Sequence, residues 1–275
     1  MTFKAACIQS TATPDLGADI AMLSAMIREA AARGATFIVT PEYCAGLETR
    51  DGKMFPVVFA EASHPALPAF QSLARELGVF LLIGSIGIRA PDGRIFNRSF
   101  MFDPQGEVAA RYDKIHLFDI NLGEGRSYQE SSTIAAGNAG VIAPCTEGLV
   151  GLSICYDIRF PHLYRAYAKA GAEMLAAPAA FTRVTGEAHW HVLQRARAIE
   201  NGAYVISPGQ CGTLAGGAEC YGHSLIVDPW GRVLADGGES PGIVMAEIDL
   251  GAVAETRRRI PSLSHDRPYS PPGKG

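Results

Sequence analysis

Residues 28–41 read REAAARGATFIVTP, and residues 165–178 read RAYAKAGAEMLAAP, an offset of 137 positions between 28 and 165. Each copy predicts a helix that ends at a glycine, followed by a short apolar strand that ends at a proline. A helix that leads directly into such a strand is typical of a crossover between parallel strands. The repeat therefore predicts an α/β protein built from two similar halves.

A second repeated segment places a hairpin at the end of each half. Residues 97–108 and 222–233 both contain Asp-Pro-x-Gly between β-rich runs. Proline fixes φ at the second position of the turn, and glycine adopts the positive φ that closes it. The order strand, helix, strand, helix, strand, hairpin thus occurs twice, with helices for only one face of each sheet. We expect the two open faces to pack together as a four-layer αββα sandwich with an internal pseudo-two-fold.

The remaining pattern sets the expected elements along the chain. Strands are expected at 4–9, 36–40, 79–88, 95–102, 108–111, 149–155, 173–177, 203–207, 224–227, 232–235 and 243–248. Helices are expected at 17–33, 65–77, 161–170, 187–201 and 250–259. Two long irregular segments remain, 42–64 and 115–139, and loops of that length usually carry function. We expect a single domain over 1–275, with 260–275 as an extended C-terminal tail.

Composition excludes several classes of partner. The net charge of −4 and pI near 6.0 predict no basic surface for nucleic acid or anionic lipid. No apolar stretch reaches the roughly 18 residues that a membrane span requires, and the apolar part of the N-terminus is too short for a signal peptide. The six cysteines form no CxxC pair, so we expect reduced thiols and a cytoplasmic protein.

No metal or organic cofactor is expected from the motifs. His189 and His191 lie two residues apart in a predicted helix, about 200° apart around it, so this pair cannot chelate one ion. HExxH, paired cysteines, a Walker loop and a GxGxxG after a strand do not occur.

Three polar residues follow predicted strands or a hairpin. Cys155 lies at the end of an apolar strand, Glu42 follows FIVTP, and Lys114 comes after the first hairpin. Together they suit a nucleophile, a base and a cation. Each also has an ordinary interpretation, because a cysteine in such a strand is often buried core, and Glu42 and Lys114 fit solvated loop positions.

The surrounding motifs decide between these interpretations, because they resemble the nitrilase superfamily of carbon–nitrogen hydrolases over nearly the whole chain. The similarity is greatest to the Nit branch, which includes deaminated glutathione amidase and omega-amidase. The motifs that carry it are Pro41-Glu42, Asn97-Arg98-Ser99, RYDKIHLFD at 111–119, GLSICYDIRFP at 151–161, AHW at 188–190, RARAIEN at 195–201, GHS at 222–224 and DPWG at 228–231.

The resemblance implies a mechanism for amide hydrolysis without a cofactor. Cys155 is the implied nucleophile and Glu42 the general base, while Lys114 and the backbone N–H of Tyr156 form the oxyanion hole. The family has a second glutamate between its lysine and its cysteine, and Glu130 fits that motif better than Glu124. The implied product is a carboxylic acid, formed with ammonia through a thioester.

Substrate recognition is less specified by these motifs. Arg183 lies on the segment after the next strand and suits a substrate carboxylate, although an exposed, solvated arginine fits equally well. Tyr43, Phe181 and Thr185 are expected in the substrate pocket. The expected substrate is a small linear amide, either an omega-amide of a 2-oxo acid or a deaminated-glutathione-like compound. An N-carbamoyl amino acid or another carbon–nitrogen substrate is the alternative.

The sequence also leaves two other functions open and predicts an oligomer. A serine hydrolase is a rival because residues 151–155, GLSIC, begin like GxSxG, but they lack its second glycine. A non-catalytic small-molecule binder is the other rival. The resembled family associates through its outer helices, so a homodimer or higher homo-oligomer is expected.

Overall fold

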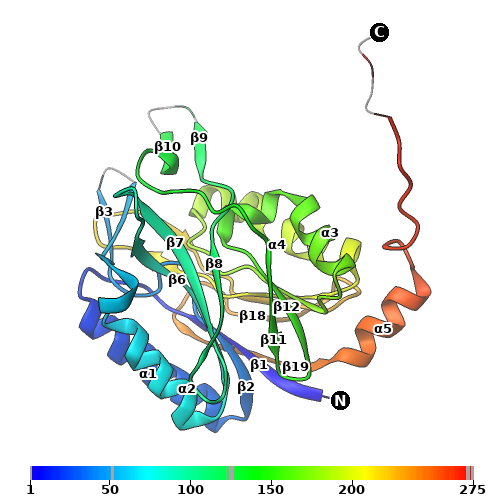
Figure 1. Cartoon of the computed structure of the whole chain (residues 1–275), viewed down its shortest axis with the longest axis horizontal. Coiled ribbons are helices and arrows are strands. Elements are labelled where there is room, and N and C mark those ends of the chain that lie inside the picture. The colour runs from blue at the N-terminus through cyan, green and yellow to red at the C-terminus, as the bar shows by residue number, and fades with distance from the viewer. Residues whose placement is uncertain (1, 51–52, 122, 124–126, 271–272, 274–275) are drawn as a thin grey trace.

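The protein is an αββα sandwich of two mixed sheets (Figure 1). The computed structural model describes residues 2–50, 53–121, 123, 127–270 and 273. Within those ranges no helix is both long and apolar enough to cross a membrane. The first sheet contains seven strands: β1 (Thr2–Gln9), β2 (Ala35–Val39), β5 (Val58–Phe59), β6 (Phe80–Arg89), β7 (Ile95–Phe102), β8 (Val108–Asp113) and β19 (Gly242–Asp249).

The second sheet repeats the topology of the first. Its six strands are β11 (Val141–Cys145), β12 (Gly148–Leu152), β13 (Met174–Ala176), β14 (Tyr204–Ser207), β17 (Leu225–Val227) and β18 (Val233–Asp236). In each sheet three parallel strands are followed by an antiparallel hairpin: β1, β2, β6 and β7–β8 in one, and β12, β13, β14 and β17–β18 in the other. The predicted duplication is therefore confirmed.

Helices cover only the outer faces. The first sheet carries α1 (Leu16–Ala32) and α2 (Ala66–Leu77), and the second carries α3 (Pro161–Lys169) and α4 (Arg183–Asn201) (Figure 1). Successive side chains of a strand point to opposite faces of the sheet. One face of the first sheet therefore packs against the second sheet, and the other packs against helices α1 and α2. Phe37 and Val39 of β2 pack between the sheets, whereas Ile38 packs with Ile27 of α1 and Phe70 of α2.

Both sheets are extended by one antiparallel edge strand. β19 pairs with β1 along its whole length, from Thr2 opposite Asp249 to Gln9 opposite Gly242. β11 occupies the equivalent place beside β12. After β19 the chain forms α5 (Leu250–Arg259) and then an exposed segment that runs away from the body of the molecule (Figure 1). Arg165 and Lys169 of α3 bind Asp266 in this segment and lower the pKa of its carboxyl to about 2.

Several predicted boundaries were wrong. The strand expected over 149–155 ends at Leu152, and Cys155 instead opens the 3₁₀ turn η3 (Cys155–Arg159). Helix α4 begins at Arg183 rather than 187, and the edge strand β11 was not predicted. The expected irregular segments contain short elements: β3 (Leu47–Arg50), β4 (Lys53–Pro56), β5, η1 (Glu61–Ser63), β9 (Asp119–Asn121), β10 (Ser127–Gln129) and η2 (Glu130–Ser132). A further hairpin joins β15 (Cys211–Thr213) to β16 (Glu219–Tyr221).

The packing between the sheets makes Phe37 a test of the sandwich. Its side chain is fully buried in the inter-sheet core, so Phe37→Ala should lower the free energy of unfolding by about 3–5 kcal/mol. The neighbouring residue Thr36 is exposed on the same strand, and Thr36→Ala should cost less than about 1 kcal/mol. Urea denaturation followed by circular dichroism measures both. Equal losses for the two variants would contradict the buried position of Phe37.

Candidate active site

The candidate site lies where three chain segments end beside one another. Glu42 follows β2, Lys114 follows β8, and Cys155 follows β12. Glu130 opens the short turn η2. All four line one cavity of about 250 Å³. The structure therefore brings together the four residues that the sequence singled out.

A buried cluster of charges forms the floor of this cavity. The Lys114 ammonium lies 2.9 Å from Glu42 Oε1 and 2.9 Å from Glu130 Oε2. The Lys114 and Glu42 side chains are each only 2% exposed. Burial by itself would lower the pKa of Lys114, but Glu130 and Glu42 reverse that effect and hold it well above its usual value. The ammonium is therefore charged at any working pH.

Backbone and amide donors fix the two carboxylates. Glu42 Oε2 accepts a hydrogen bond of 2.8 Å from the N–H of Ala180, and Glu130 Oε2 accepts one of 2.6 Å from the N–H of Phe118. Asn97 Nδ2 donates to Glu42 Oε1 at 2.8 Å and to Glu130 Oε1 at 3.4 Å. Fully paired carboxylates tolerate burial that isolated ones do not. The cluster is thus held rigidly before any substrate arrives.

The structure adds Asn97 to the site, a residue whose role the sequence reasoning missed. Asn97 is fully buried on β7, and its backbone carbonyl also accepts the N–H of Lys114 at 3.0 Å. It thereby positions Lys114 as well as both carboxylates. The Asn97-Arg98-Ser99 motif marks this position as part of the family pattern. The spacing of the motif does not indicate which residues the Asn97 amide contacts.

Cys155 is presented by a strained turn. Its φ of 46° lies in the left-handed region that non-glycine residues seldom adopt. Its N–H donates to the carbonyl of Pro178 at 2.8 Å. Asp157 fixes the turn, because its buried carboxylate accepts from the N–H of Ile154 at 2.8 Å and from the Tyr112 hydroxyl at 2.7 Å. The turn that carries Cys155 is therefore tied to β8, the strand that Lys114 follows.

The resting thiol is protonated. Burial raises the pKa of Cys155 well above its usual value, and the neighbouring Glu42 carboxylate raises it further, while Lys114 opposes both. A preformed thiolate is therefore not the ground state of this site. Glu42 lines the same cavity as the thiol and acts on its pKa, so it is also the group placed to take the proton.

The serine alternative is disfavoured by the position of Ser153. Its buried hydroxyl donates to the carbonyl of Ala176 at 2.7 Å and shares a 2.6 Å hydrogen bond with the Tyr164 hydroxyl. Both partners lie on the side of β13 and α3, and Ser153 is not among the residues that line the cavity.

The two long segments supply the upper walls of the cavity. Lys53, Met54 and Phe55 come from β4, and Phe118 and Tyr128 flank or belong to the β9–β10 hairpin. Both hairpins project from the same end of the sandwich (Figure 1). Of the predicted pocket residues, Tyr43, Tyr156, Phe181 and Thr185 line the cavity. Glu124 lies outside the residues that the structure describes.

Arg183 is placed differently from the other predicted pocket residues. Its guanidinium lies 3.2 Å from Glu239 and 3.2 Å from Glu187, and its side chain is 37% exposed. It is absent from the cavity lining, whereas Lys53 is part of it. The geometry thus offers Lys53 as a second candidate for a cation that meets a substrate carboxylate.

The protonated state of Cys155 predicts its alkylation profile. The rate of iodoacetamide modification should still be rising above pH 9, because burial and Glu42 both raise the thiol pKa. Glu42→Gln removes the negative charge, so its profile should level off at a lower pH. Peptide mass spectrometry at Cys155 separates this signal from the other five cysteines, all of which are buried. Profiles that level off at one pH in both proteins would contradict the role of Glu42.

Comparison with known proteins shows the family of the chain. The sequence model of the family described as "Carbon-nitrogen hydrolase" matches residues 4–258. The deaminated glutathione amidase of Synechocystis is 40% identical over 268 residues, covering 96% of this chain and 97% of the relative. The human deaminated glutathione amidase is 39% identical, covering 96% and 82%. Human omega-amidase NIT2 is 35% identical, covering 97% and 95%.

Solved structures show the same fold. The NitFhit protein of C. elegans superposes with a TM-score of 0.86 at 32% identity, covering 97% of this chain, which spans 65% of that longer chain. Nit3 of Saccharomyces cerevisiae, described as a member of the nitrilase superfamily, gives a TM-score of 0.83 at 29% identity with 94% of each chain covered. With a matching family model over residues 4–258, close relatives over nearly the whole length and the same fold, the chain belongs to the carbon-nitrogen hydrolase family.

Proposed function

We propose that this protein is a cysteine-dependent amidase that converts a small linear amide to a carboxylic acid and ammonia through a thioester. The observation that carries the proposal is the cavity floor, where the Cys155 thiol lies beside the Glu42 carboxylate and the buried Lys114 ammonium. A nucleophile, a base and an electrostatic stabiliser that line one cavity are the groups that amide hydrolysis requires.

Acylation begins with proton transfer from Cys155 to Glu42. The sulfur then forms a bond to the amide carbon, and the π electrons of the carbonyl move onto its oxygen. Protonated Glu42 returns the proton to the nitrogen, the carbon–nitrogen bond breaks, and ammonia leaves. This sequence needs no preformed thiolate, in agreement with the raised pKa of Cys155.

Lys114 is the proposed stabiliser of the oxyanion. An ammonium has three N–H groups, and two of those of Lys114 are committed to Glu42 and Glu130. The third is available to the cavity, which Lys114 lines. The N–H of Tyr156 belongs to the first turn of η3, where N–H groups have no carbonyl partner within the turn. Together they supply two donors, each typically worth a few kcal/mol.

Deacylation uses the same base. Glu42 takes a proton from water, the hydroxide oxygen bonds to the thioester carbon, and the carbon–sulfur bond breaks as the thiol regains its proton. Glu130 does not touch the reacting atoms in this scheme. It holds Lys114 through its carboxylate, which keeps the ammonium aimed at the oxyanion.

We propose a deaminated-glutathione-like amide as substrate, with an omega-amide of a 2-oxo acid as second candidate. The relatives named deaminated glutathione amidase at 40% and 39% identity support the first, and the omega-amidase at 35% supports the second. Both substrates are carboxylic acids. Lys53 on β4 supports this class, because it gives the cavity lining a cation whose ammonium is not bound into the buried cluster.

A homodimer through α4 is the proposed assembly. Val192 and Ile199 on this helix are 69% and 51% exposed, an unusual exposure for two large apolar side chains on one helix face. Trp230 is also exposed, and the residue that follows it, Gly231, lies against Ile199. We further propose a cytoplasmic location, which the six free cysteines support.

The mechanism predicts the effects of five substitutions on ammonia release. Cys155→Ala should abolish turnover without loss of fold, and Glu42→Gln and Lys114→Met should each reduce it by about two to three orders of magnitude. Glu130→Gln should be severe and Glu124→Gln mild. Near wild-type turnover in Cys155→Ala would exclude the covalent mechanism, and equal effects of the two glutamate changes would exclude the role of Glu130.

The two candidate cations predict different effects on substrate charge. If Lys53 meets the substrate carboxylate, Lys53→Ala should reduce the preference for an acidic amide over its methyl ester by about 1 kcal/mol, or roughly fivefold. Arg183→Ala should leave that ratio nearly unchanged, because its guanidinium is paired with Glu239 and Glu187. The ratio of kcat/KM values for the two substrates is the measurement. The reverse result would assign the carboxylate to Arg183.

The assembly is tested at the exposed face of α4. The double substitution Val192→Glu with Ile199→Glu should convert the homodimer to a monomer at micromolar concentration, since two buried charges oppose association. Leu149→Glu places a single negative charge at another exposed apolar residue, on β12, and should leave the dimer intact. Light scattering gives the mass of each variant. A monomeric wild-type protein would rule out the dimer.

A further inference from the structure

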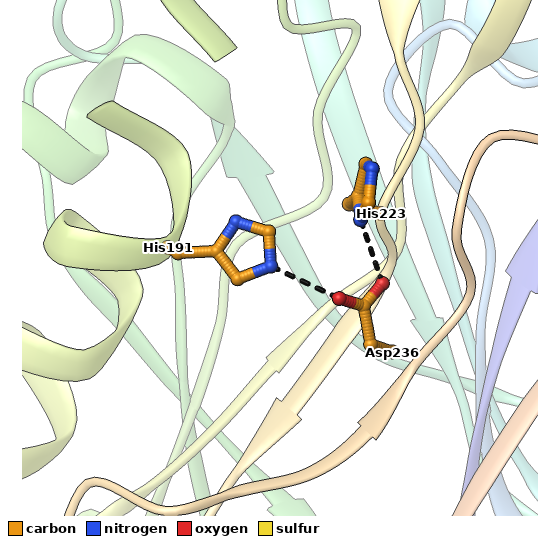
Figure 2. A group of neighbouring side chains, drawn as sticks. All are labelled: His191, His223 and Asp236. Carbon is orange, nitrogen blue, oxygen red and sulfur yellow. Dashed lines mark hydrogen bonds and ion pairs between the residues drawn. The ribbon is translucent and has the colours of Figure 1, made fainter. Parts of the chain in front are cut away.

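A group of metal-ligating side chains lies outside the catalytic cavity. His191 comes from α4, His223 from the turn between β16 and β17, and Asp236 from the end of β18. One donor atom from each residue lies within 4.8 Å of the others. The three side chains point toward one another, with the Asp236 carboxylate between the two imidazoles (Figure 2). None of the three lines the cavity of Cys155.

We propose that His191 Nε2, His223 Nδ1 and the Asp236 carboxylate form a binding site for a Zn²⁺-type divalent cation. Two imidazole nitrogens and one carboxylate oxygen are a donor set that suits zinc, with water as the fourth ligand. The proposal is independent of the amidase chemistry, because the site and the cavity share no residue.

Side-chain rotation is needed to bring the three donor atoms together. His191 Nε2 lies 3.0 Å from Asp236 Oδ2, and His223 Nδ1 lies 2.9 Å from the other carboxylate oxygen, Oδ1. Tetrahedral ligands at zinc bond lengths are separated by about 3.3 Å. One donor atom from each residue lies within 4.8 Å of the others, so the wider separations must close before one carboxylate oxygen and both nitrogens can share a cation. The side chains are 20–35% exposed, so they can rotate and leave space for a water ligand.

Metal binding sets a requirement on the two imidazoles. A ring nitrogen binds a cation only when it carries no hydrogen, so the bound state requires Nδ1–H on His191 and Nε2–H on His223.

Hydrogen bonds orient the carboxylate of the site. Asp236 Oδ1 accepts from the N–H of Gly238 at 2.9 Å, in addition to its contacts with His191 and His223. The carboxylate is thus held between the two imidazoles by three partners.

The expected role of the cation is a cross-link between α4 and the second sheet. The carbonyl of His223 already accepts a 2.7 Å hydrogen bond from Trp190 Nε1, and the Trp190 ring packs 5.0 Å from that of Phe181, a cavity wall. A cation on His191 and His223 would fasten the helix at the residue next to Trp190. Binding to the folded state alone also raises thermal stability.

Zinc titration of tag-free protein tests the site. The Cys155→Ala background removes the cavity thiol as a competing ligand. We expect one Zn²⁺ per chain by calorimetry, with a dissociation constant in the micromolar range. His191→Gln and Asp236→Asn should each weaken binding at least tenfold. His189→Gln is the matched control, since His189 is on the same helix but bonds Arg159 instead, and it should change the affinity less than twofold.

Thermal unfolding provides a second readout. Saturating Zn²⁺ should raise the melting temperature by roughly 5 °C in the Cys155→Ala protein, and by much less in Asp236→Asn. Absence of saturable binding would reduce the three residues to a hydrogen-bonded cluster and overturn the proposal. Binding that survives both His191→Gln and Asp236→Asn, or that falls equally in His189→Gln, would place the ion elsewhere and overturn it too.

Discussion

The ion pair between Lys114 and two carboxylates is the constraint on which the rest of the site depends. A buried charge is costly unless it is paired and hydrogen-bonded, and here the ammonium meets Glu42 and Glu130 at 2.9 Å each. Removal of Lys114 would leave the Glu42 and Glu130 carboxylates together in the interior without a cation. The three segments that carry these residues must therefore meet within a few ångströms of one another. The completed first sheet brings Glu42 and Lys114 together, and the segment after the β9–β10 hairpin brings Glu130 to them.

The duplicated sandwich explains why those segments meet. In each half, parallel strands direct their carboxyl ends to the same edge, where open α/β sheets commonly place their ligands. Glu42 follows β2 of the first sheet and Cys155 follows β12 of the second. Packing the sheets face to face joins the two edges, so the base comes from one half and the nucleophile from the other. Neither half contains the site alone.

Local sequence signals predicted this framework and failed where contacts are distant. Helix-to-strand repeats and Asp-Pro-x-Gly turns are local, so they gave the layers and the duplication. The turn at Cys155 was read as strand, because its positive φ depends on Asp157 bonding to Tyr112 across 45 residues. Asn97 was missed for the same reason, since its partners lie 55 and 33 residues away. The grouping of His191 and His223 with Asp236 was missed for the same reason. Motif spacing tested His191 only against its near neighbour His189.

The pairing of β19 with β1 has a consequence for synthesis on the ribosome. One edge of the first sheet is closed by residues 242–249, almost the last structured part of the chain. Until they emerge, β1 presents unpaired N–H and C=O groups, which are a template for wrong pairing. The N-terminal half can therefore assemble its helices early but cannot complete its sheet. The need for a chaperone during translation should thus depend on the delay before β19 is synthesised.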